Sequence, residues 1–185
     1  MRAVRWLDRQ LRNARFRRAR PFVGPGDVVV DVGCADGEMF DQWDDTIGPS
    51  IGYDPDVETT TAAGRHELRP GVFPEDAPGD LACDVITMLA VLEHVPPDRQ
   101  ASLATACARS LRPGGRVVVT VPSPLVDRIL DVLGALRLID GMHADEHYGF
   151  APSDTLTVFG GDEFELVTHR RFQLGLNNLF VFRRR

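Results

Sequence analysis

The stretch that decides the fold is Val28–Glu38, which reads V-V-V-D-V-G-C-A-D-G-E. Its first half is a short run rich in β-branched residues, which is typical of a strand buried on both faces. Its second half, Gly33–Gly37, is a turn with two glycines, which permit tight turning and close backbone approach. The stretch therefore predicts a buried strand, a turn and the start of a helix.

Strand-like and helix-like segments alternate along the chain on both sides of this stretch. Strands are predicted at 27–32, 50–53, 71–73, 84–89, 116–121, 165–169 and 179–182, and helices at 3–19, 37–45, 57–68, 98–111 and 125–138. The last two strands are too close together for a crossover helix, so they should form an antiparallel hairpin. The pattern predicts an α/β, Rossmann-like, doubly wound seven-stranded sheet, mostly parallel with an antiparallel last strand.

The composition is that of one soluble globular domain over residues 1–185, because 185 residues with 43% apolar side chains can build a single core. Eight of the 21 basic residues, all arginines, precede residue 21, so residues 1–20 are expected to form a basic N-terminal helix and a candidate lid. The net charge of −6 makes nucleic acid an unexpected partner. The three separated cysteines favour a reduced, cytoplasmic chain, and no apolar run reaches the roughly 20 residues of a membrane span.

An acidic residue, Asp54, ends the second predicted strand, 21 positions after Gly33. A carboxylate at about this distance from a glycine turn can accept hydrogen bonds from ribose hydroxyls, which indicates a nucleoside ligand. The turn lacks the G-x-G-x-x-G pattern of dinucleotide sites, and the carboxylates of Asp31 and Asp36 would repel a pyrophosphate. They suit a cationic ligand such as the sulfonium S-adenosylmethionine.

Three blocks in this order resemble the class I S-adenosylmethionine-dependent methyltransferases, of the small-molecule group that includes the ubiquinone-biosynthesis type. They are V-V-D-V-G-C-A-D-G at 29–37, D-V-I-T-M-L-A-V-L-E-H-V at 84–95 and L-R-P-G-G-R-V-V-V-T-V-P at 111–122. The resemblance covers about residues 22–183. It implies S-adenosylmethionine as cofactor, S-adenosylhomocysteine as product, and a last strand inserted antiparallel into the sheet.

The resemblance also implies roles for residues of the cofactor site. The methionine portion of the cofactor would be lined by Asp31, Gly33, Ala35 and Gly37, and Asp54 would bind the ribose. Pro55 would lie beside the adenine, and Glu75 or Asp76 would approach its amino group. Leu89 and Ala90 would lie under the cofactor. Ala35 departs from the family, which usually has glycine there. Because a methyl group is a small intrusion, binding is expected to survive.

Histidines are the candidate bases for removing a proton from an acceptor, since histidine titrates near neutral pH. His94 follows the fourth predicted strand, and His147 lies in a loop that glycines bracket at positions 141 and 149. For His94, a structural role competes with catalysis; for His147, ordinary loop hydrogen bonding does. His143 and His147 have metal-binding spacing, but a loop without a third ligand favours no metal site.

The acceptor is expected to be a small metabolite, sugar or lipid intermediate. The N/D-P-P-Y motif of amino-group nucleic-acid methyltransferases is missing, and a chain without lysine cannot build a Lys-Asp-Lys-Glu site. Two alternatives stay open: an RNA- or protein-directed methyltransferase that uses the arginine-rich helix, and a non-catalytic S-adenosylmethionine-binding module. The oligomeric state is left open too.

Overall fold

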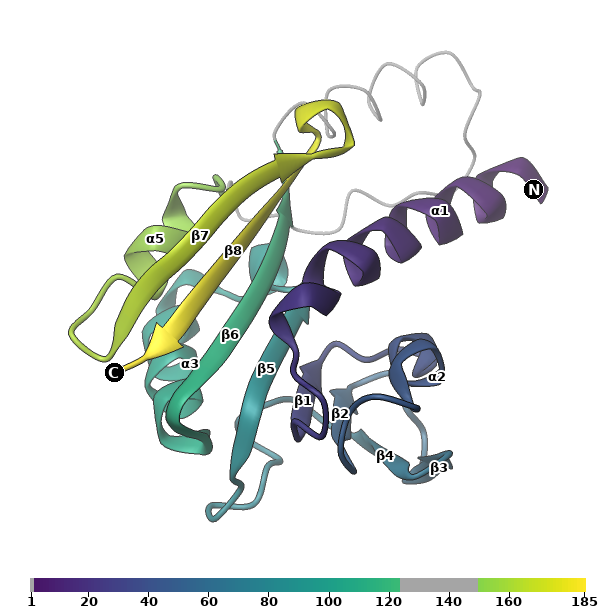
Figure 1. Cartoon of the computed structure of the whole chain (residues 1–185), viewed down its shortest axis with the longest axis horizontal. Coiled ribbons are helices and arrows are strands. Elements are labelled where there is room, and N and C mark those ends of the chain that lie inside the picture. The colour runs from purple at the N-terminus through teal and green to yellow at the C-terminus, as the bar shows by residue number, and fades with distance from the viewer. Residues whose placement is uncertain (1, 124–149) are drawn as a thin grey trace.

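The computed structural model describes residues 2–123 and 150–185, and its centre is one eight-stranded sheet (Figure 1). The strands lie in the order β3-β4-β2-β1-β5-β6-β8-β7. Their bounds are β1 Val29–Val32, β2 Ile51–Asp54, β3 Thr61–Ala63, β4 His66–Pro70, β5 Cys83–Leu89, β6 Leu111–Pro122, β7 Phe164–Phe172 and β8 Asn177–Arg184.

The five strands β4, β2, β1, β5 and β6 are parallel neighbours, and β8 enters antiparallel between β6 and β7. The expected α/β class, the mostly parallel sheet and the reversed last strand are thereby confirmed. The strand count is eight rather than seven, because β3 pairs antiparallel with β4 as a short added hairpin.

Helices cover both faces of the sheet, as the doubly wound prediction requires (Figure 1). The α-helices are α1 Arg2–Ala19, α2 Glu38–Trp43, α3 Pro97–Ser110 and α5 Asp154–Val158, and the single-turn 3₁₀ helices are η1 Arg20–Phe22, η2 Leu92–His94 and η3 Gln173–Gly175. No helix in residues 2–123 and 150–185 combines the length and the apolar character that crossing a bilayer would require.

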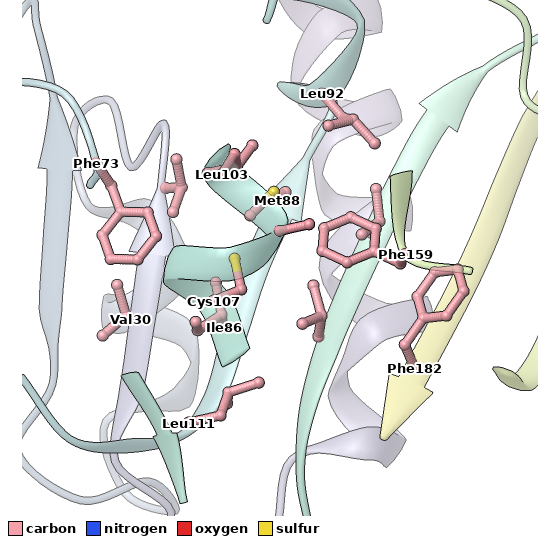
Figure 2. Packing of buried hydrophobic residues seen from close by; sticks show 14 of the residues in the cluster. Val30, Phe73, Ile86, Met88, Leu92, Leu103, Cys107, Leu111, Phe159 and Phe182 are labelled. Carbon is pink, nitrogen blue, oxygen red and sulfur yellow. The ribbon is translucent and has the colours of Figure 1, made fainter. Parts of the chain in front are cut away.

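Successive residues of the central strands supply two separate hydrophobic cores, because side chains alternate between the faces of a sheet. Val29 packs in the core under α1 and α2, together with Phe16 and Trp43. Its neighbour Val30 packs in the core under α3 and α5, where Figure 2 shows it with Ile86 among other apolar side chains. This arrangement explains why the central strands are apolar on both faces.

The predicted helix over 57–68 and the weak strand over 71–73 are wrong. The chain forms the β3–β4 hairpin instead, and its turn includes Gly64 with a φ of +61°. Three consecutive threonines at 59–61 precede that turn, and threonine favours strands over helices. The third parallel strand, β4, therefore begins five residues earlier than predicted, at His66. The predicted helix over 125–138 falls outside the described residues.

All three cysteines are buried and carry free thiols. Cys34 lies in the core under α1 and α2, whereas Cys83 and Cys107 lie in the core under α3 and α5. Burial raises the pKa of Cys34 and of Cys83 to about 12, and that of Cys107 well above its ordinary value. The three thiols are therefore protonated and unreactive in the folded chain.

Candidate functional site

The carboxyl ends of β1, β2 and β5 meet at one edge of the sheet. Val32 is in register with Tyr53 on one side and with Met88 on the other. The residues that follow these three positions are Gly33, Asp54 and Leu89, so the predicted cofactor residues of three strands share this edge. In open α/β sheets, ligands bind at such an edge.

The glycine turn directs its backbone N–H groups into the protein. Gly33 and Cys34 both donate to the carbonyl of Tyr53, over 2.8 and 3.3 Å. The N–H of Gly37 donates to the carbonyl of Cys34 over 2.9 Å, and the N–H of Ala35 donates to Asp54 Oδ2 over 2.8 Å. A turn whose N–H groups are engaged in this way offers a phosphate little of the cradle that dinucleotide sites provide.

Both glycines of this turn are required by backbone conformation and by packing. Gly33 has a φ of +74°, and a Cβ there would come within 2.4 Å of Val91. Gly37 has a φ of +77°, and its Cβ would lie 2.9 Å from Leu68. Ala35 also has a positive φ, +46°, so the position at which the resemblance leads one to expect glycine has a glycine-like conformation.

Asp54 is buried, with 8% of its surface exposed, and it ends β2 beside the turn. Its Oδ2 accepts the N–H of Ala35 and its Oδ1 accepts the N–H of Asp56 over 2.9 Å. These bonds fix the carboxylate and leave each oxygen a second lone pair. Asp54 can therefore accept a hydroxyl hydrogen bond while it holds the turn.

Asp31 lies in the sheet itself, on the face covered by α1 and α2, with 4% of its surface exposed. Thr87 of β5 donates its hydroxyl hydrogen to Asp31 Oδ1 over 2.6 Å. Burial raises the pKa of Asp31 to about 7, the Thr87 hydrogen bond opposes this rise, and the charge of Asp54 adds to it. This edge of the sheet therefore holds Asp31, an acid that titrates near neutral pH, and the carboxylate of Asp54 lies close to it.

The chemistry of this edge fits S-adenosylmethionine better than a dinucleotide. A sulfonium and an ammonium group are attracted to the carboxylates of Asp31 and Asp54, whereas a pyrophosphate is repelled. Four of the five backbone N–H groups of the turn, those of Gly33, Cys34, Ala35 and Gly37, are already engaged, so few donors are left to compensate such repulsion. On this fit, Asp54 would hold the ribose, and the segment Gly33–Gly37 would border the methionine portion.

The remaining predicted cofactor residues lie at or near the same edge. Leu89 and Ala90 are half-buried at the end of β5, and Ala90 has a φ of +66°. Pro55 is exposed directly after Asp54. Of the two acids expected near the adenine, Asp76 accepts the N–H of Val72 over 2.7 Å and so shapes its own turn, and Glu75 lies 3.6 Å from Arg99 of α3. Their contacts with the cofactor remain predictions.

Among the predicted bases, His94 ends η2, just beyond the carboxyl end of β5, and its side chain is exposed. His143 and His147 lie outside the described residues, so their roles stay predictions. His66 and His169 serve packing: His66 stacks on Phe40 at 4.8 Å between ring centroids, and His169 on Phe180 at 4.1 Å. Within the described ranges, no three potential metal-ligating side chains group together.

Two contacts at this site were missed from the sequence. The first is Thr87, whose only signal was a polar residue inside the apolar run D-V-I-T-M-L. The second joins α1 to the glycine turn: Arg12 pairs with Asp36 over 3.1 Å and also with Glu38, which Arg9 contacts over 3.2 Å. The basic N-terminal helix thus lies against the acidic turn.

Comparison with known proteins agrees with this geometry. The family described as "Methyltransferase domain" matches residues 4–166. A ubiquinone biosynthesis O-methyltransferase of Cupriavidus pinatubonensis is 32% identical over 160 residues, which cover 78% of this chain and 63% of the relative. A Burkholderia thailandensis protein of the same name is 33% identical over 60% of this chain and 51% of its own length. The chain thus spans about half to two thirds of these relatives.

Solved structures show the same fold at lower identity. A SAM-dependent methyltransferase from Archaeoglobus fulgidus superposes with a TM-score of 0.69 at 16% identity, covering 95% of this chain and 94% of that one. A Burkholderia thailandensis 1,6-didemethyltoxoflavin-N1-methyltransferase with bound S-adenosylhomocysteine gives 0.67 at 17% identity, covering 97% and 80%. With its sheet order, its acidic glycine turn and the matched domain, the chain belongs to the class I methyltransferase family, with S-adenosylmethionine as the cofactor.

Proposed function

We propose that this chain transfers a methyl group from S-adenosylmethionine to an oxygen atom of a small-molecule acceptor. The observation that carries the proposal is the position of His94 at the cofactor edge. Of the three histidines in the described residues, His94 alone lies beyond the carboxyl end of a sheet strand, and its side chain is exposed. The names of the curated relatives, which are O-methyltransferases, support an oxygen acceptor.

When bound, S-adenosylmethionine supplies an activated methyl group and takes up the electron pair of the carbon–sulfur bond that breaks. In the proposed reaction the acceptor oxygen forms the new bond to carbon, and His94 takes the hydroxyl proton. Asp54 orients the cofactor through its ribose, and the Asp31 carboxylate stabilises its positive charge. Much of the rate enhancement comes from positioning, because effective molarities for aligned groups reach about 10⁵–10⁸ M.

The test compares His94→Ala and His94→Gln with the unchanged chain. Calorimetry measures S-adenosylmethionine affinity, and methyl transfer is assayed with a panel of small phenols, sugars and hydroxylated lipids. Loss of a general base should lower turnover by about 10²- to 10⁴-fold and leave cofactor affinity unchanged. His169→Ala, which removes a histidine packed on Phe180, is the matched control and should keep its turnover.

The same assay separates the alternatives. Methylation of RNA or protein in preference to every small molecule would contradict the small-molecule acceptor, and retention of RNA that weakens with salt would accompany it. Cofactor binding without turnover across the whole panel, with RNA and protein included, would favour a non-catalytic binding module. Full activity of both His94 variants would remove His94 from the mechanism.

A further inference from the structure

Two buried polar atoms, one on β6 and one on β8, lack a hydrogen-bond partner. Thr120 is 0% exposed and Asn177 is 4% exposed. Within residues 2–123 and 150–185, nothing bonds to the Thr120 hydroxyl or to Asn177 Oδ1. Because most buried polar groups in folded proteins are hydrogen-bonded, each exception calls for an explanation.

The register of the sheet makes these two residues diagonal neighbours. Thr120 is in register with Leu179, and Asn177 with Pro122, so their Cα atoms lie about 7–8 Å apart. Val118 and Leu179 belong to the core under α1 and α2, and side chains two residues apart share a face of the sheet. Thr120 and Asn177 therefore both lie on this face, where one hydroxyl group can contact both.

The pair borders the cofactor edge. Leu89 is in register with Thr120, and the N–H of Ala90 donates to the Thr120 carbonyl over 2.9 Å. Asp31 lies on the same face, and the strands follow in the order β2, β1, β5, β6 and β8. With the ribose on Asp54 of β2 and the methionine portion beside β1, the pair lies on the side of the methionine portion that faces away from the ribose.

The neighbours of Asn177 determine which of its amide atoms is left. Gln173 Nε2 donates to the carbonyl of Leu11 over 3.4 Å, so Gln173 Oε1 is the atom that accepts from Asn177 Nδ2. Asn177 is left with Oδ1, which can only accept, whereas the Thr120 hydroxyl can donate or accept. A ligand group that satisfies both must carry a hydrogen, as a hydroxyl or an N–H does and an ether or ketone oxygen does not.

We propose that Thr120 and Asn177 bind a hydroxyl or N–H group of the methyl acceptor, on the face of the sheet under α1. This inference rests on the proposed function and adds a requirement to it. The reacting oxygen must lose its proton, whereas the group held by Asn177 must keep one. The acceptor therefore carries this donor group in addition to the oxygen that takes the methyl group.

The contacts of α1 allow an acceptor to reach the pair. α1 is joined to this part of the face at Leu11, through the bond from Gln173. Nearby, Arg9 and Arg12 bind the glycine turn by ion pairs whose arginines are partly exposed, and such pairs contribute little stability. An acceptor can therefore enter beneath this half of α1 from the carboxyl edge of the sheet.

Phenol and anisole test the requirement for a donor, because anisole has a methyl group in place of the hydroxyl hydrogen. Nuclear magnetic resonance of the isotope-labelled chain, saturated with S-adenosylhomocysteine, follows the backbone amide signals of residues 120 and 177 and gives both dissociation constants. Phenol should bind about 2- to 12-fold more tightly than anisole, as expected for one hydrogen bond. Thr120→Val and Asn177→Leu, which keep the shapes of the side chains, should each reduce this preference.

Thr155→Val is the matched control. The Thr155 hydroxyl is also buried and without a partner in the described part of the chain, but it lies on α5, which covers the other face of the sheet. Replacing either threonine removes a buried polar group that nothing satisfies, so both variants should raise the melting temperature by about 2–4 °C. Only Thr120→Val should change the preference for phenol.

The outcomes decide the proposal. Equal affinity for phenol and anisole in the unchanged chain, or no saturable shift at residues 120 and 177, overturns it, since the two atoms then hold only water. A preference for phenol that survives in both folded variants overturns it as well. His94→Ala should keep the preference, because binding does not need a base. Failure of the proposed reaction, with turnover unchanged in His94→Ala, is thereby distinguished from failure of this binding site.

Discussion

Asp31 lies within β1 and Asp54 ends the neighbouring strand β2, and their surroundings give them different chemistry. Asp54 accepts hydrogen bonds from two backbone N–H groups, at Ala35 and Asp56, which fix the orientation of its carboxylate. Asp31 has one hydroxyl donor, Thr87, in an otherwise apolar layer, and burial dominates its titration. The cofactor edge therefore combines a fixed acceptor with an acid whose charge depends on pH.

Replacing Asp54 with alanine should weaken S-adenosylmethionine binding by about 10- to 150-fold. This range corresponds to about 1.5–3 kcal/mol, the value of a hydrogen bond to a charged group. Calorimetry measures the dissociation constant. Asp56→Ala removes the same charge two residues away, from an exposed side chain, and should bind nearly normally. Equal affinity of the folded Asp54→Ala variant would show that Asp54 does not hold the ribose.

S-adenosylmethionine should bind more tightly as pH rises toward about 7. Below its pKa of about 7 Asp31 is neutral, and a cationic ligand favours the ionised form, so binding near pH 6 should release close to one proton. Affinity should then change by up to about tenfold per pH unit below 7 and level off above it. Calorimetry in buffers of different ionisation enthalpy measures the released proton.

The free energy of unfolding should change with pH in the opposite direction to the cofactor affinity. The unfolded chain ionises Asp31 near a pKa of ~3.9, whereas the folded chain keeps the proton to about 7. The free energy of unfolding without cofactor should therefore fall between about pH 4 and 7, relative to Asp31→Asn. Thr87→Val removes the bond that lowers the pKa and should move the binding midpoint upward. A pH-independent affinity would contradict this role of Asp31.

At the residue scale, the sequence predicts positions better than contacts. Gly33 and Asp54 could be placed at the ligand edge because each directly follows a strand-like run. The bond between Asp31 and Thr87 could not be foreseen, because it depends on the register of β1 with β5. Likewise, nothing in a single sequence indicates that Asp76 is engaged by the N–H of Val72.

At the scale of elements, α1 is attached to the domain in two ways. Its arginines pair with Asp36 and Glu38 at the glycine turn, and its last turns bury Phe16 edge-on against Trp43 at 6.5 Å between ring centroids. Exposed ion pairs contribute little because water and salt screen them, whereas a buried aromatic ring contributes through area and packing. Packing should therefore hold α1 in place.

Phe16→Ala should lower the free energy of unfolding by about 3–5 kcal/mol, the usual cost of truncating a buried phenylalanine. Arg12→Ala should lower it by less than about 1 kcal/mol, and this difference should vanish in about 1 M salt. Urea unfolding at low and high salt measures both. A larger loss for Arg12→Ala than for Phe16→Ala would show that charge fixes the helix.

The elements that could not be predicted share one physical cause. A doubly wound sheet normally places a helix between parallel strands, so the region 57–68 was expected to be helical. The chain instead joins β2 to β4 through the β3–β4 hairpin. The low helix propensity of the region 57–68 agrees with that outcome, since the threonines at 59–61 and Gly64 both disfavour a helix. Local propensity decided this connection against the general pattern of the fold.

At the scale of the whole molecule, the topology follows from the strand pattern. A chain of alternating elements allows few arrangements with right-handed crossovers, and two final strands joined by a short turn must lie antiparallel. The sheet order, with β8 between β6 and β7, agrees with that expectation. The addition of β3 is a feature that only the assembled sheet reveals.

Because all three thiols are buried, the rate at which each thiol is alkylated reports how often the structure around it opens. Cys34 lies in one core, at the cofactor turn, and Cys83 and Cys107 lie in the other. A maleimide can alkylate each thiol only when its own core opens, so mass spectrometry should find two labelling rates, one for each face of the sheet. Saturating S-adenosylmethionine should slow alkylation of Cys34 more than that of Cys83 or Cys107, because the ligand stabilises the turn that covers Cys34. Alkylation of all three thiols within seconds would mean that neither core stays closed, and equal protection by the cofactor would mean that both faces open as one cooperative unit.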